Sequence, residues 1–254
     1  MRIAVAVANL TLGVVYTSYG IMTIEDMRRG WKTMGFSHFG AAWIAMAFTC
    51  GPHHLFHGFH AAFEGRLGGS LDLAAVLVGF PAGVTWFLLR IEAFRGGHGD
   101  RFISGTPGWV MAIPSLAGVY VAGLVASSIA IAGAGFSFRG TIIPNALLVI
   151  LYCAIGYFLT RTQLRNREPL GGWSVSGLSL AVIFPTCAFM HGVFFLYSGI
   201  GQYAHDVHGF AIDWLAVPAA AYFLWVVRGL YVDALRDWNK EPDPAREVAP
   251  ALVR

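Results

Sequence analysis

Long apolar stretches, each near the length that crosses a lipid bilayer, are the feature that most limits the fold of this chain. A helix needs about 20 apolar residues to cross roughly 30 Å of hydrocarbon. Seven stretches of this kind lie at 3–22, 40–63, 71–94, 109–131, 141–159, 175–200 and 210–232. Within lipid, the backbone of each stretch must satisfy its own hydrogen bonds, as a helix does. The sequence therefore predicts an all-α, polytopic integral membrane bundle of seven transmembrane helices.

Composition supports a membrane protein and argues against other classes. Of the 254 residues, 56% are hydrophobic and 12% are charged, whereas about 25% are charged in an average soluble domain. The net charge is only +3 and the basic residues are scattered, so the lipid bilayer is the expected partner and nucleic acid is not. Cys50, Cys153 and Cys187 lie inside apolar stretches, which is untypical of a secreted disulfide framework.

Basic residues in the connections predict the orientation. Most of them follow the first, third, fifth and seventh stretches: Arg28, Arg29, Lys32, Arg90, Arg95, Arg101, Arg161, Arg165, Arg167, Arg228, Arg236 and Lys240. The other side has Arg2, Arg66 and Arg139. Because cytoplasmic loops carry the excess of Lys and Arg, we expect the N-terminus outside and the C-terminus in the cytoplasm. The expected organisation is a transmembrane domain at 1–235, in the plasma membrane of a bacterium, and a short disordered cytoplasmic tail at 236–254.

The second stretch carries an unusual run of histidines. An imidazole in hydrocarbon costs free energy unless it has a hydrogen-bonding partner or a metal. At about 100° per residue, one helix face would hold most of the polar side chains. They are His53, His57, His60 and Glu64, with Cys50 and His54 beside them. Such a face is expected to point into the bundle, where a kink at Pro52 would widen the space in front of it.

The sixth stretch repeats part of this pattern. Thr49-Cys50-x-x-x-His54 has a counterpart in Thr186-Cys187-x-x-x-His191. Each segment presents a thiol and an imidazole one turn apart, where both can bind one ion. Two such pairs facing each other would supply two sulfurs and two nitrogens, a set suited to zinc or copper. The match is short, so an internal repeat and a coincidence are both open.

The seventh stretch adds further polar residues. His205 and His208 lie near its start, and Asp213 lies a little deeper. In the predicted orientation they share the outer level of the membrane with His191. An acid inside an apolar span is usually paired, so Asp213 would orient a ligating histidine or accept a proton. If the helix starts later, His205 and His208 belong to a solvated loop instead.

Together these residues predict an outward-facing metal site inside the bundle. The expected ligands are His53, His54, His57, His60, His191, His205, His208, Cys50 and Cys187, with Asp213 and Glu64 as candidate general bases. Copper or zinc is the expected metal, iron is compatible with the same side chains, and two ions would form a binuclear site.

Four functions fit such a site. In the first, the ion activates water or oxygen, and the chain is a metal-dependent oxidoreductase or hydrolase acting on a hydrophobic small molecule. In the second, the chain senses or handles metal without catalysis. In the third, His54 or His57 pairs with His191 to ligate a haem for electron transfer. In the fourth, no metal binds and the histidines line a transport pathway.

Overall fold

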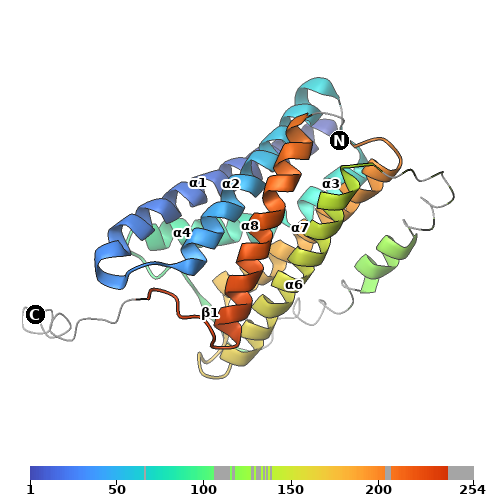
Figure 1. Ribbon diagram of the computed structural model, residues 1–254. Coiled ribbons are helices and arrows are strands. Elements are labelled where there is room, and N and C mark those ends of the chain that lie inside the picture. Colours follow the sequence, from blue (N-terminus) through green and yellow to red (C-terminus); the bar gives the residue numbers. More distant parts are fainter. Residues whose placement is uncertain are drawn as a thin grey trace, which may run out of the picture.

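The computed structural model describes residues 1–65, 67–105, 115, 118–126, 129, 133, 135, 137, 139–203 and 207–239, with only the backbone of 207–210. These residues form an elongated bundle of long helices that run up and down beside one another (Figure 1). The first half holds α1 (Arg2–Met34), α2 (His38–Phe59), the π-helix η1 (His60–Glu64), α3 (Ser70–Leu77) and α4 (Phe80–Phe94). The second half holds α6 (Ile142–Asn166), α7 (Val175–Gly199) and α8 (Val207–Tyr231). A short antiparallel pair joins β1 (Phe102–Ile103) to β2 (Trp173–Ser174), with Phe102 opposite Ser174.

The all-α prediction is confirmed for the described part of the chain, together with its membrane character. Five helical segments there are long and apolar enough to cross a membrane: Arg2–Met34, Ser70–Phe94, Ile142–Asn166, Val175–Gly199 and Ala211–Tyr231. The second predicted stretch forms α2 and η1, although its histidines make it more polar than these five. The fourth predicted stretch, at 109–131, and the tail from 240 onward lie mostly or wholly outside the described residues. The count of seven transmembrane helices therefore stays a prediction.

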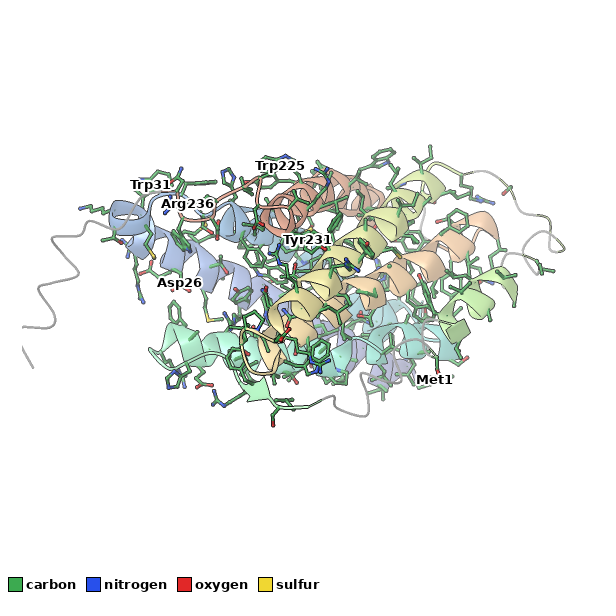
Figure 2. The ribbon with its side chains drawn as sticks, turned by 90° about the horizontal axis from the view of Figure 1, so that it is seen from below. Met1, Asp26, Trp31, Trp225, Tyr231 and Arg236 are labelled. Atoms are coloured by element: carbon green, nitrogen blue, oxygen red, sulfur yellow. The ribbon has the colours of Figure 1, made fainter. Side chains whose placement is uncertain are left out.

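The two ends of the bundle differ in charge. The Met1 end carries the start of α1, the end of α2 and the start of α8, and the Met34 end carries the opposite ends of these helices. Asp26, Trp31 and Arg236 lie far from Met1, at the Met34 end (Figure 2). The basic residues that follow α1, α4, α6 and α8 belong to this same end. The structure thus gathers the charges as expected, while the side of the membrane each end faces stays a prediction.

Close packing of α1 on α2 rests on glycines. A Cβ atom added at Gly51 would lie 2.4 Å from Oγ1 of Thr17, and one added at Gly13 would lie 2.6 Å from the side chain of Leu55. Helices in membranes pack through such small residues because their backbones can then approach each other closely. The glycines therefore fix where the histidines of α2 stand relative to α1.

The caps of α2 and α7 show that the two halves of the bundle are built alike. Ser37 caps α2 and donates a hydrogen bond to Asp237 (3.1 Å), while Ser174 caps α7 and donates one to Asp100 (2.6 Å). The two serines, at 37 and 174, are separated along the chain by the same interval as the two aspartates, at 100 and 237. A serine of one half and an aspartate of the other half thus meet at the start of the second helix of each half.

The buried polar contacts repeat at nearly the same interval. Nδ1 of His54 lies 2.8 Å from Oδ1 of Asn9, and Nδ1 of His191 lies 2.7 Å from Oδ1 of Asn145. Each asparagine also donates to the backbone carbonyl four residues before it. Moreover, α2 packs on α8 while α7 packs on α4, the reciprocal contacts of a two-fold relation. The Thr-Cys-x-x-x-His match therefore marks an internal structural repeat and not a coincidence.

Candidate metal centre

Two histidines of α2 lie at the candidate metal centre. His53 and His57 are one turn apart, so that both project from the same face of the helix. Both are buried, at 3% and 5% exposure, and their Nε2 atoms lie 2.6 Å apart. Two ring nitrogens this close cannot both present lone pairs to each other; they must share a proton or a cation. The local sequence thus places two nitrogen donors at one point in the bundle.

Helices α7 and α8 bring the other donors to this point. The ring of His191 lies 5.0 Å from that of His53 between centroids, and Oδ1 of Asp213 lies 3.5 Å from Nε2 of His53. His191 and Asp213 are 1% and 0% exposed. One ligand atom from each of the three residues lies within 4.8 Å of the other two, so this cluster could hold a metal ion.

The spacing is close to that of a coordinated ion. Zinc binds imidazole nitrogen and carboxylate oxygen at about 2.0–2.2 Å, which puts the ligand atoms of a tetrahedral site about 3.3–3.5 Å from one another. The 3.5 Å between His53 Nε2 and Asp213 Oδ1 falls at this value. The widest pair, at up to 4.8 Å, would need only a small side-chain adjustment. The geometry is therefore compatible with one ion between α2, α7 and α8.

Asn145 on α6 joins two of these three side chains. Its Nδ2 donates to Oδ2 of Asp213 (2.8 Å), so its Oδ1 is left to accept from Nδ1 of His191 (2.7 Å). His191 must then carry its proton on Nδ1, which leaves the lone pair on Nε2 for a metal. Tyr203 also donates to Oδ2 of Asp213 (3.0 Å). These bonds hold Asp213 by one oxygen, while the other oxygen faces His53.

Aromatic rings close one side of the centre. Phe194 stacks on His57 with centroids 4.3 Å apart and an interplanar angle of 15°. The ring of Tyr203 also stacks on Phe194, with centroids 4.9 Å apart and an interplanar angle of 20°. Its hydroxyl oxygen lies 3.4 Å from Nε2 of His53. Burial of Asp213 and the histidines behind these rings keeps bulk water away and strengthens any bond to a cation.

Other predicted ligands lie elsewhere. His54 turns to Asn9 of α1, outside the three-residue cluster. His60 lies at the Met1 end of the bundle in a 2.8 Å contact with Glu64, whose side chain is 39% exposed. The structure therefore brings Asp213, but not Glu64, to the cluster. Coordination by His54 or His60, and a general-base role for Glu64, stay predictions.

The two thiols share a different place. Cys50 and Cys187 line a cavity with room for about one water molecule, together with Tyr16, Trp43 and Phe184. The Sγ atom of Cys50 lies 3.5 Å from the hydroxyl oxygen of Tyr152. The predicted set of two sulfurs and two nitrogens is not the cluster that the described residues form. His205, and the side chain of His208, lie outside the described residues.

Sequence reasoning missed the residues that hold the ligands in place. Asn145 and Tyr203 were not among the expected site residues, although a buried asparagine in an apolar stretch is as unusual as a buried histidine. A usable signal existed in the repeat: Asn9 and Tyr16 recur as Asn145 and Tyr152, with the same spacing between them. Comparisons with known protein families, with characterised proteins and with solved structures gave no match.

Proposed function

We propose that this chain is an integral membrane metalloprotein whose centre binds a transition-metal ion at His53, His191 and Asp213, with His57 as a further nitrogen ligand. The observation that carries the proposal is the convergence of buried ligand atoms from α2, α7 and α8 within 4.8 Å. Folding removes these polar groups from water, which is costly unless each one is hydrogen-bonded or bound to a cation. A bound ion would satisfy all of them at once.

The donor set narrows the choice of metal. Imidazole suits zinc, copper, iron and nickel, and a carboxylate fits the same group of ions, whereas thiolate would favour copper(I). Cys50 and Cys187 are not part of the cluster. We therefore propose zinc or copper(II) as the metal, with iron(II) as the alternative that two histidines and one carboxylate also hold.

The space around the centre bears on what the ion does. The cavity beside His57 and Phe194 has room for about one water molecule. Water fits this space, whereas a haem or a lipid is far larger. We therefore favour metal binding and handling over haem-based electron transfer and over catalysis on a bulky hydrophobic substrate. With the predicted orientation, the centre lies toward the outer side of the membrane.

Metal analysis of the purified protein tests the proposal. Protein purified in detergent is expected to carry at least about one equivalent of zinc, copper or iron per chain by elemental analysis, with no haem absorption band. His191→Ala and Asp213→Asn should each lose the ion, because each removes one ligand. His38→Ala is the control, since His38 bonds Tyr222 at the start of α2, away from the centre.

Two results would contradict the proposal. One is wild-type protein that takes up no metal at neutral pH after incubation with each of the three ions. The other is equal loss of metal in His38→Ala and His191→Ala, which would show that the ion is not held at the cluster.

A further inference from the structure

The small cavity beside His57 and Phe194 adjoins the centre. Its lining residues come from α1, α2, α3 and α7 and the segment before α3; they include Asn9, His57, Asp72, Val76, Met190 and Phe194. It has room for about one water molecule, or for a single metal ion. His57 borders both this cavity and the centre, because its other ring nitrogen contacts His53.

The internal repeat explains why a cavity lies here. At the repeat interval, His53 corresponds to Met190, from 53 to 190, and Asp213 corresponds to Val76, from 76 to 213. Both counterparts line the cavity. The cavity therefore occupies the position in one half-to-half interface that the centre occupies in the other. The centre and the cavity are therefore equivalent positions of the fold, and different side chains line them.

Polar atoms at this second position lack partners. Nδ1 of His57 and Oδ1 of Asp72 are both buried and make no hydrogen bond within normal distance among the described residues, with the hydroxyl group of Tyr197 near the same carboxylate. The two side chains line the cavity together, and Asp72 is 8% exposed. Its other oxygen accepts from the backbone N–H of Gly69 (2.8 Å), which fixes the carboxylate at the start of α3. Two buried polar atoms without hydrogen bonds are costly, and an occupant that both of them bind would remove the cost.

The chemistry of the lining selects a metal ion as this occupant. An imidazole nitrogen, a carboxylate oxygen and the thioether of Met190 are a donor set of the kind that copper accepts. We propose that the cavity is a second copper site, held by His57 Nδ1, Asp72 Oδ1 and the sulfur of Met190, and joined to the first ion through the imidazole of His57. With an ion on each nitrogen, this ring carries no proton, and the displaced proton leaves to solvent.

This inference rests on the proposed function of the centre, and the stoichiometry of Cu²⁺ binding separates the two. Metal-free protein in detergent is incubated with Cu²⁺, desalted and analysed for bound metal. Wild-type protein is expected to hold about two ions per chain. Asp72→Asn and Met190→Leu should each hold about one, because the asparagine keeps an oxygen for Gly69 and the leucine keeps the volume of the side chain. Electron paramagnetic resonance should show magnetic coupling of the two ions in the wild type and not in the Asp72→Asn and Met190→Leu variants.

Met46→Leu is the matched control, since Met46 is buried beside the cavity of Cys50 and Cys187, which His57 does not line. This variant should still hold two ions. The thermal unfolding midpoints of all variants identify any that fail to fold. Wild-type protein that holds one ion overturns the second site and leaves the centre intact. A variant at Asp72 or Met190 that still holds two ions also overturns it. Wild-type protein that holds no Cu²⁺ overturns the second site, and it refutes the proposed function itself if Zn²⁺ and Fe²⁺ do not bind either.

Discussion

Asn145→Ala is the perturbation that most directly tests how the centre is held. The change removes the bond from His191 Nδ1 to Asn145, the bond from Asn145 to Asp213 and the bond from Asn145 to the carbonyl of Thr141. None of the proposed ligand residues is itself changed. Residues that orient metal ligands typically contribute 10- to 100-fold in metal affinity. The expected loss for Asn145→Ala is therefore about 1.4–2.8 kcal/mol of binding free energy.

The internal repeat supplies a matched control. Asn9 makes the same contacts in the other half, to Nδ1 of His54 and to the carbonyl of Val5, but it does not touch His191 or Asp213 in any contact that the described residues show. Loss of either asparagine leaves one imidazole without its buried partner, at a cost of about 1–3 kcal/mol in stability. Both variants should therefore lower the thermal unfolding midpoint, and Asn145→Ala by at least as much as Asn9→Ala, because it also removes a donor to Asp213. Only Asn145→Ala should weaken metal binding.

The assay is competition for Zn²⁺ between the detergent-purified protein and a chelator of known affinity. Thermal unfolding of the metal-free protein is measured in parallel. The reasoning is refuted if Asn145→Ala binds Zn²⁺ as tightly as the wild type. It is also refuted if Asn9→Ala weakens binding as much as Asn145→Ala, because the loss would then follow general destabilisation and not the orientation of the ligands.

Three further outcomes are expected. Tyr203→Phe removes the hydroxyl that donates to Asp213 and should weaken Zn²⁺ binding about tenfold, measured by the same competition; unchanged affinity would remove Tyr203 from the centre. Bound metal should fall as the pH is lowered, because histidine and carboxylate ligands must be deprotonated to bind, and elemental analysis after dialysis at pH 7 and pH 5 measures this; metal fully retained at pH 5 would argue against histidine ligands. Gly51→Val should destabilise the bundle more than Gly123→Val, because a side chain at 51 meets Thr17 on α1, whereas one at 123 meets nothing within 4 Å; equal unfolding midpoints would contradict the close packing of α1 on α2.

Much of the fold follows from the sequence because hydrophobic length and helical period are local properties. The apolar stretches at 141–159 and 175–200 predict α6 and α7, and the structure has helices at Ile142–Asn166 and Val175–Gly199. The third stretch shows the limit of this reasoning. It is interrupted between α3 and α4, just before Pro81, which cannot donate a backbone hydrogen bond and stands in the first turn of α4.

Part of the centre was also readable from the sequence. The i, i+4 spacing of His53 and His57 places both on one helix face whatever surrounds the helix. The partial sequence match around His54 and His191 suggests an internal repeat. The matching hydrogen bonds of the two asparagines to these histidines then distinguish a repeat from a coincidence.

The sequence alone determined that the chain forms membrane helices and that one of them carries a buried polar face. Only the tertiary structure decided which donors meet. His53 and His54 are neighbours in the chain, yet His53 faces Asp213 and His54 faces Asn9. Adjacent residues on a helix point about 100° apart, so the packing of α7 and α8 on one side and of α1 on the other selects between them. A metal centre depends on angles and distances between helices far apart in sequence, and these are set by packing that no local pattern records.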